Sequence, residues 1–283
     1  MFCPGNPERP KREGCPAFEL TLGRIRACLA EISRELQQEG LPVTEEGRVR
    51  LGAFAGTAFH TEEKISEDGA KVEKCEERWR TSETGTGWGE IFEILKTILF
   101  HEFLNESFVV VRASRFDDIK NGIDNIILDK ETGSIVCAFD EVSALPHDRR
   151  SDEKTWKILS GNRRGTSLKY SLVLKDGEIV PGPELRDIPI FCLDLPCEEV
   201  RRLFYGFKVL KEGALPAGSF SIFQGLIESI TRQARTLKKA NISEKIRAKI
   251  EEFIEKKDPL GESVLMKLRK LAGLEEIEAS SKI

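Results

Sequence analysis

The sequence predicts an α+β protein, with a mixed central β-sheet flanked by helices and a helical C-terminal tail. Residues 88–105 carry apolar side chains at helical spacing, and residues 108–112, which follow closely, are a run of β-forming side chains. After Gly213 the pattern changes to amphipathic helices alone, at residues 220–240, 243–257 and 262–272. We therefore expect three regions: residues 1–86 as an N-terminal arm and helical region, residues 87–210 as the α/β core, and residues 211–283 as a helical C-terminal region.

The N-terminal region is expected to begin with a loosely docked arm, because residues 1–16 are rich in Pro, Gly and charge. In residues 17–39 apolar side chains recur at spacings of three to five, which indicates an amphipathic helix ended by Gly40. The highly charged residues 62–80 are compatible with a solvated helix. The rest of residues 41–87 has no pattern that predicts a structure.

The core is expected to contain a β-hairpin. Two strand patterns, at residues 122–128 and 134–142, are separated by residues 129–133, which end in Gly. The other elements expected in the core are helices at residues 152–159 and 196–206 and strands at residues 167–174, 177–180 and 188–193.

Composition excludes several classes of function. The 44 Lys+Arg and 48 Asp+Glu residues give a net charge of -4, so nucleic acid or an anionic membrane would have to bind a local patch. The apolar runs fall short of the roughly 20 residues that a bilayer-spanning helix needs. The first residues lack the apolar stretch of a signal peptide, and the seven cysteines form no CxxC pair. We expect a cytoplasmic protein with free thiols and no membrane partner.

Two acids in the hairpin are the main chemical signal. Asp124 lies at the start of the first strand and Asp140 near the end of the second. If the loop has five residues, so that Leu128 pairs with Ser134, Asp140 is the diagonal neighbour of Asp124 on the same face, within roughly 7–8 Å. A four-residue loop would put the acids on opposite faces, because side chains alternate along a strand. The prediction of a shared site therefore depends on the register.

Acids within apolar β-strands are costly unless they are paired, hydrogen-bonded or bound to a cation. Mg²⁺ binds a small number of carboxylates and carbonyls together with several waters, so we predict that these two acids hold Mg²⁺ or Mn²⁺. Asp117 and Asp118 precede the hairpin as a second acidic pair, for which a helix N-cap or turn role is favoured. In another interpretation the hairpin acids cap strands or pair with arginines such as Arg112 or Arg115.

The segment 113–124, with an acidic helix before it and an apolar strand ending in Asp after it, resembles the PD-(D/E)XK nuclease superfamily, and within it a bacterial branch. The resemblance covers about residues 87–196. It implies a restriction-endonuclease-like core and Mg²⁺-dependent hydrolysis of phosphodiester bonds in DNA. It also implies roles for five residues: Asp124 and Asp140 as metal-binding acids, the carbonyl of Glu141 as a third ligand, and Glu90 or Glu93 as an assisting acid on the preceding helix.

The sequence departs from the superfamily pattern at Val142, where the motif has a Lys two residues after the second acid. That ammonium is thought to position the attacking water and to stabilise charge on the phosphate. A lysine on a neighbouring element would replace it, and the candidates are Lys154, Lys157 and Lys169. Lys157 is preferred if residues 152–159 form a helix beside the hairpin, and the alternative for Lys157 is an ordinary solvated helix lysine.

A nuclease also needs contacts to phosphates. Residues 149–169 hold seven basic side chains against two acids, and residues 232–249 hold seven against one. The basic residues of the first window are Arg149, Arg150, Lys154, Lys157, Arg163, Arg164 and Lys169. The alternative for both windows is a solvated helix surface.

The leading prediction is therefore a metal-dependent nuclease acting on DNA. The alternative, which Val142 favours, is a catalytically inactive nuclease-like module that binds nucleic acid or a protein partner.

Overall fold

The computed structural model describes residues 16–80, 88–142, 162, 165–207, 215–216, 218–238, 242 and 244–255. The α-helices in this part of the chain are α1 (Pro16–Gln38), α2 (Glu62–Arg80), α3 (Trp88–Leu104), α4 (Arg115–Asn121), α6 (Cys197–Gly206), α7 (Ser219–Lys238) and α8 (Glu244–Glu255), with a 3₁₀ turn, η1, at Leu51–Phe54. The strands are β1 (Phe108–Arg112), β2 (Asn125–Asp129), β3 (Ile135–Val142), β4 (Thr166–Leu168), β5 (Leu172–Lys175), β6 (Glu178–Pro181), β7 (Leu185–Ile188) and β8 (Ile190–Asp194). The helices predicted at residues 152–159 and 262–272, and the arm before residue 16, lie outside the described residues.

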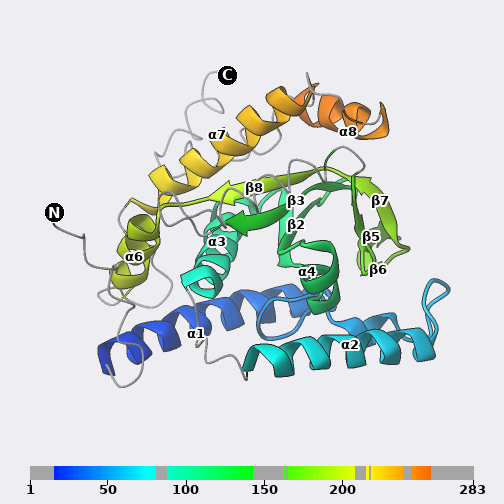
Figure 1. Cartoon of the computed structure of the whole chain (residues 1–283), viewed down its shortest axis with the longest axis horizontal. Helices are drawn as coiled ribbons and strands as arrows, with labels where there is room; N and C mark the ends of the chain where they lie inside the picture. Colours follow the sequence, from blue (N-terminus) through cyan, green and yellow to red (C-terminus); the bar gives the residue numbers. More distant parts are fainter. Residues whose placement is uncertain are drawn as a thin grey trace, which may run out of the picture.

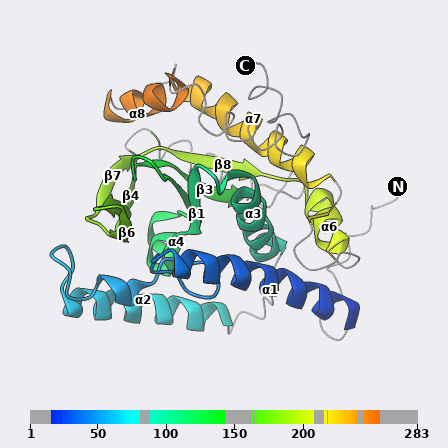
Figure 2. The ribbon, with the colours of Figure 1, turned by 180° about the vertical axis from the view of Figure 1, so that it is seen from behind.

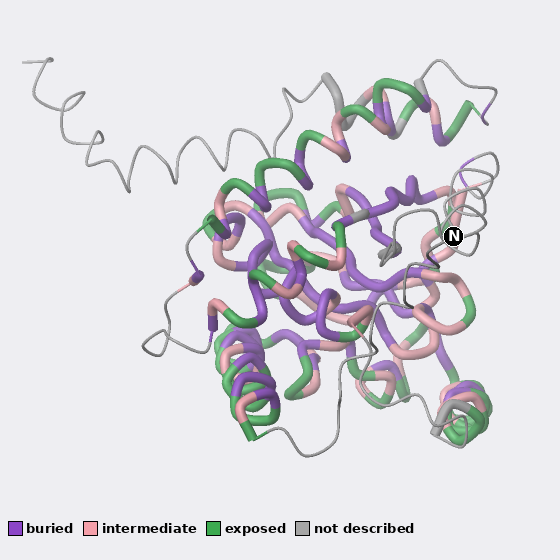
Figure 3. The backbone as a smooth tube through the Cα atoms, turned by 60° about the vertical axis from the view of Figure 1, so that its left-hand side comes forward, coloured by how far each residue is buried: buried purple, intermediate pink, exposed green. Residues whose placement is uncertain are grey.

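The fold is α+β, as predicted. A four-stranded mixed sheet in the order β1-β2-β3-β8 is accompanied by two small sheets, β4-β7 and β5-β6. Figures 1 and 2 show the main sheet between α1 and α2 on one side and α7 and α8 on the other. Figure 3 shows that the buried segments gather in the centre, between helices whose outer faces are exposed. No helix of the described residues has the length and apolar character needed to cross a bilayer.

Helix α3 is the central element of the core. Its apolar residues recur on all sides, as expected for a helix that is covered by other elements. Phe92, Leu95, Ile98 and Phe100 are all at most 1% exposed. One continuous cluster of buried side chains includes α1, α3, the main sheet, α6, α7 and α8. A polar side chain on α3 is therefore held inside the core, and Lys96 is such a residue.

The main sheet combines antiparallel and parallel pairing. β1 and β2 are antiparallel, β2 and β3 are antiparallel, and β3 and β8 are parallel. The segment before η1 extends the sheet beyond β1, because the Val49 N–H donates to the Arg112 carbonyl at 3.0 Å and the Arg112 N–H donates to the Gly47 carbonyl at 2.9 Å. This segment is thereby fixed beside the C-terminal end of β1.

The register of the β2–β3 hairpin differs from the predicted pairing of Leu128 with Ser134. The Asp129 N–H donates to the Ser134 carbonyl at 3.0 Å, which leaves a four-residue loop, and Leu128 pairs with Ile135. The side chain of Asp129 fixes this turn, because it accepts the N–H groups of Glu131 and Thr132 at 2.8 Å each.

A four-residue loop by itself would have placed the two hairpin acids on opposite faces of the sheet. A β-bulge between Ile127 and Leu128 shifts the register by one residue, so that Ile126 pairs with Ala138 and Asn125 with Phe139. The pairing runs as far as Asn125 and Phe139, and the Asp124 N–H donates to the Phe139 carbonyl at 2.8 Å, so Asp124 and Asp140 both adjoin the last pair. The bulge therefore restores a shared face, although the predicted loop length was wrong.

Two of the predicted strands are divided. Residues 167–174 form β4 and β5, which belong to different sheets, because the N–H groups of Lys169 and Tyr170 between them donate to the carboxylate of Asp117 in α4 instead of to a neighbouring strand. Residues 188–193 are divided at Pro189, which has no N–H group to donate to a sheet and separates β7 from β8.

Two amide side chains cover the outer edge of β8. The Gln233 side chain of α7 accepts the Cys192 N–H at 2.9 Å and donates to the Cys192 carbonyl at 2.6 Å. Asn162 does the same at Ile190, at 2.9 and 2.6 Å. Each amide takes the place of a neighbouring strand, so this edge of the sheet is closed to further strand pairing.

Gln233→Ala is expected to lower the free energy of unfolding by about 1–3 kcal/mol, because a backbone donor and acceptor of β8 lose their partner. Urea unfolding measures the loss. Gln224→Ala on the same helix is the matched control, since its side chain is exposed and hydrogen-bonds only to Glu228 among the described contacts. Equal stability of the two variants would contradict this role for Gln233.

Candidate active site

The hairpin brings Asp124 and Asp140 together at one end of the main sheet. The Asp124 N–H donates to the Phe139 carbonyl and its carbonyl accepts the Ala113 N–H, both at 2.8 Å, so its backbone is held between β1 and β3. Asp124 is 6% exposed and Asp140 is 7% exposed. Both carboxyl groups are therefore nearly withdrawn from water.

Gly122 keeps space beside the second acid. It ends α4 in the left-handed conformation, with φ 65°. A Cβ at this position would lie 3.4 Å from Asp140 Oδ2 and would also strain the backbone. The end of α4 therefore approaches the Asp140 carboxylate without a side chain in between.

The electrostatic environment of Asp124 disfavours its charged form. Burial raises the pKa of Asp124 well above its ordinary value, and the carboxylates of Glu93 and Asp140 raise it further. Lys96 acts in the opposite direction. The carboxylates near this position therefore outweigh the neighbouring ammonium, which is the condition under which an additional cation is stabilised.

Lys96 of α3 is the cation of this cluster, and it was missed by the sequence analysis. Burial lowers its pKa to about 7, while Asp124, Glu93 and Asp140 act to raise it. The ammonium also lies 5.9 Å from the centre of the Phe139 ring. The signal was present in the sequence, because one lysine in a helix that is apolar on all sides is costly to bury unless charged or polar partners meet it.

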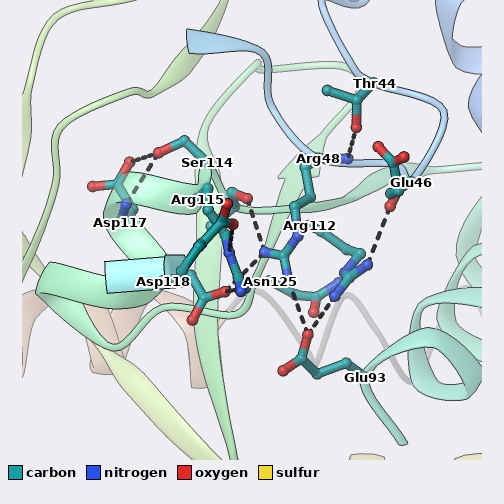
Figure 4. Close-up of polar contacts among 12 residues, drawn as sticks. Thr44, Glu46, Arg48, Glu93, Arg112, Ser114, Arg115, Asp117, Asp118 and Asn125 are labelled. Atoms are coloured by element: carbon teal, nitrogen blue, oxygen red, sulfur yellow. Dashed lines mark hydrogen bonds and ion pairs between the residues drawn. The ribbon is translucent and has the colours of Figure 1, made fainter. Parts of the chain in front are cut away.

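Glu93 lies one turn before Lys96 and is held by two arginines (Figure 4). Its Oε2 atom accepts Arg48 at 3.0 Å and also accepts Arg112. Burial raises the pKa of Glu93, but the Arg112 and Arg48 guanidiniums outweigh burial and leave that pKa below its ordinary value. Glu93 is thus a stable carboxylate whose described hydrogen bonds both use Oε2.

A pocket of about 680 Å³ lies beside Glu93, and its described lining includes neither Asp124 nor Asp140. Residues from five different parts of the chain line it, among them Arg48, Arg50, Glu93, Arg112, Arg115 and Asp118. Figure 4 shows Arg48 between Glu93 and Asp118. Its Nη1 lies 3.0 Å from Asp118 Oδ2, so one guanidinium connects α3 to α4.

The second acidic pair has structural roles, but neither acid is the N-cap or turn residue that the sequence favours, because both lie inside α4. Ser114 is the N-cap of α4 and accepts the Asp117 N–H. The buried Asp117 carboxylate accepts Ser114 Oγ and Asn121 Nδ2, both at 2.7 Å, in addition to the two backbone N–H groups between β4 and β5. Asp118 accepts Arg115 at 2.6 Å. Asp117 thus joins α4 to the small sheets.

Two other predicted site residues lie away from the acid pair. Glu90 forms a half-exposed ion pair with Arg26 at 3.6 Å and lies on the wall of the pocket. The ammonium of Lys169 binds Asp68 of α2 and lies 4.9 Å from the centre of the Phe116 ring, and its predicted catalytic role stays a prediction. The Asp68 side chain of α2 is fully buried, so its carboxylate requires a charged partner, and Lys169 forms such an ion pair.

The remaining predicted site residues are described only in part or not at all. The backbone of Glu141 belongs to β3 and pairs with Leu193. Lys154, Lys157, Arg149, Arg150, Arg163 and Arg164 lie outside the described residues, so their predicted roles stay predictions. The second basic window falls on α7 and α8, where Lys245 lies 3.7 Å from Asp187.

The donor set at the acid pair suits a hard cation. Within the described residues no group of three or more His, Cys, Asp or Glu side chains could hold a metal ion. Mg²⁺ is commonly bound through one or two carboxylates while it keeps several waters. Asp124 and Asp140 match that mode of binding, and burial, followed by the charges of Glu93 and Asp140, raises the pKa of Asp124.

Comparisons of this chain with protein-family models, with curated proteins and with solved structures give no match. The class of protein must therefore be argued from the residues of the site and from the arrangement of the elements that carry them.

Proposed function

We propose that this protein is a metal-dependent nuclease that hydrolyses phosphodiester bonds in DNA. The observation that carries the proposal is the meeting of two buried acids, Asp124 and Asp140, with the buried Lys96. The order of a helix, an antiparallel β1–β2–β3 meander and a strand β8 parallel to β3 is consistent with a restriction-endonuclease-like core. The resemblance of residues 87–196 to PD-(D/E)XK nucleases supports the same class.

In this proposal Asp124 and Asp140 hold Mg²⁺ or Mn²⁺, and the Glu141 carbonyl of β3 is the third protein ligand. The metal would polarise the phosphate and lower the pKa of a bound water. Lys96 takes the role of the lysine that Val142 replaces, so that its ammonium stabilises negative charge on the phosphate. Glu93 is fixed by Arg48 and Arg112 and keeps Lys96 in place through its charge.

The charges of the site also explain why a divalent cation would be needed. Two carboxylates and one amine lie together where little water reaches them. The ammonium balances one carboxylate, and the second stays uncompensated unless it holds a proton or a metal ion. A bound divalent cation removes this conflict, and a phosphate group would complete the charge balance.

The test is cleavage of supercoiled and linear DNA with Mg²⁺ or Mn²⁺ by the native chain and by Asp124→Ala and Asp140→Ala. Loss of cleavage in both variants supports the nuclease. Glu131→Gln is the matched control, because this exposed acid lies in the turn of the same hairpin and its removal should leave cleavage unchanged.

Lys96→Met tests which lysine acts. We expect this variant to lose cleavage by at least about a hundredfold, in line with the loss of one preorganised donor to a developing negative charge. Lys157→Met and Lys169→Met test the lysines suggested by the sequence. Cleavage that survives in Lys96→Met but is lost in Lys157→Met would move the role to Lys157.

The second candidate function is an inactive nuclease-like module, and Val142 in β3 is the observation that favours it. Its signature is DNA binding without cleavage under any divalent metal. Calorimetry with Mn²⁺ also distinguishes the nuclease from the inactive module, since the inactive module need not bind metal at Asp124 and Asp140.

A further inference from the structure

We infer that the pocket beside Glu93 is a subsite for a phosphate of the DNA strand next to the bond that is cut, and that Arg50 contacts this phosphate. The inference rests on the proposed function, because it assigns the pocket to the same substrate. It gives a role to the segment that includes residues 43–52, to which the sequence assigns none.

The position of the pocket supports this assignment. Arg112 is part of its wall and pairs with Asn125, the residue after Asp124, and the Ala113 N–H donates to the Asp124 carbonyl at 2.8 Å. A strand whose scissile phosphate lies at Asp124 and Asp140 would therefore place a neighbouring nucleotide at the pocket. A volume of about 680 Å³ is suited to part of a strand more than to a single ion.

The described wall of the pocket carries four arginines, which offer donors to an acceptor-rich ligand, and five acids, of which Glu76, Glu93 and Asp118 are paired with these arginines. Each guanidinium carries five N–H groups, and phosphate oxygens are their usual bidentate partners. Arg50 is exposed, and its described hydrogen bond is to the Val43 carbonyl at 2.8 Å, so no carboxylate among the described contacts neutralises it. Arg112 Nε is buried without a hydrogen-bond partner in the described part of the chain.

The other arginines form a rigid wall. Arg48 is tied to Glu93 and Asp118, and Arg115 is tied to Glu76 at 2.8 Å. The backbone that carries Arg48 and Arg50 is hydrogen-bonded to β1, and the Arg50 N–H donates to the Pro42 carbonyl at 2.8 Å. Arg50 is thus a cation on a fixed backbone, which lowers the entropic cost of binding a phosphate.

Glu46 provides a second test of the charge of the ligand. It is an exposed acid of the same pocket, and its hydrogen bond from Thr44 lowers its pKa, so it is ionised at neutral pH. An anionic ligand is repelled by Glu46 and attracted by Arg50. A neutral or cationic ligand would not respond to both residues in this way.

The experiment measures the Kd of a short fluorescent DNA duplex for the full chain over a range of salt concentrations, with divalent metal chelated so that no cleavage occurs. Arg50→Gln is expected to weaken binding about tenfold and to reduce the slope of log Kd against log salt by about 0.9, the value for one lost phosphate contact. Glu46→Gln is expected to tighten binding. Arg186→Gln is the matched control, because its side chain is 75% exposed and lies on β7.

The inference is overturned if Arg50→Gln leaves both the Kd and the salt slope unchanged, if Glu46→Gln weakens binding, or if the native chain binds no duplex. It is also overturned if millimolar inorganic phosphate displaces the duplex, which would mean that the pocket takes free phosphate. Cleavage assays fail or succeed independently of these results. If the chain binds DNA through Arg50 but never cleaves it, the subsite stands and the proposed nuclease function fails. If the chain cleaves DNA and Arg50→Gln has no effect, the nuclease function stands and the subsite fails.

Discussion

Asp124→Asn is expected to raise the free energy of unfolding of the metal-free protein while it removes metal-dependent cleavage. Asn has nearly the same shape as Asp, so the backbone contacts to Phe139 and Ala113 are kept. The substitution removes a carboxylate whose charge is opposed by burial and by Glu93 and Asp140. A residue kept at a cost in stability is typical of a functional site.

The pH dependence follows from the same shift. The folded-state pKa of Asp124 is raised above its unfolded value, so this group stabilises the fold fully only below the unfolded pKa, and the contribution is lost as pH rises through the folded pKa. We expect the stability advantage of Asp124→Asn to grow over that window. Urea unfolding at several pH values with chelator measures it.

Metal is expected to reverse the order of stability of the native chain and Asp124→Asn. At a Mg²⁺ concentration one hundred times its Kd, the native chain should gain about 2.7 kcal/mol, and Asp124→Asn should gain much less. Glu131→Gln should behave as the native chain in both conditions. A variant that is less stable than the native chain with chelator would contradict the electrostatic account of this site.

Asp117→Ala is expected to lower the free energy of unfolding by about 3–5 kcal/mol, because several donors lose their acceptor inside the protein. The Asp117 side chain is fully buried and accepts the N–H groups of Lys169 and Tyr170 at 2.8 and 3.1 Å. These are the bonds that connect α4 to the chain between β4 and β5. Neither N–H group has a strand partner to replace the carboxylate.

Asp117→Asn separates the loss of acceptors from the loss of packing. Asn keeps one oxygen of the same shape but replaces the other by a donor, so its loss of stability should lie between those of the native chain and Asp117→Ala. Glu178→Ala, an exposed acid on β6, is the control and should stay within about 0.5 kcal/mol of the native chain. A value for Asp117→Ala inside the same range would contradict the role given to this carboxylate.

The elements that depend on local periodicity could be predicted from the sequence. Residues 17–39 form α1 almost to the residue, and the strand after α3 was also predicted. Residues 62–80 form α2, although their charge made them only compatible with a solvated helix and no periodicity predicted it. Apolar spacing determines which face of such an element is buried, whatever covers it. The two acids of the hairpin were found for the same reason, since a charge within an apolar strand is visible in the sequence.

Only the tertiary structure decided how these residues meet. The bulge between Ile127 and Leu128 shifts the register so that Asn125 pairs with Phe139, the neighbours of the two acids, and no local pattern encodes a one-residue shift between strands. Lys96 lies within the influence of Asp124, Glu93 and Asp140 because α3 packs against the sheet, and Lys169 is bound by Asp68 of α2. The physical reason is that the free energy of a buried charge depends on its neighbours in space, which the chain determines only after its helices and strands have packed.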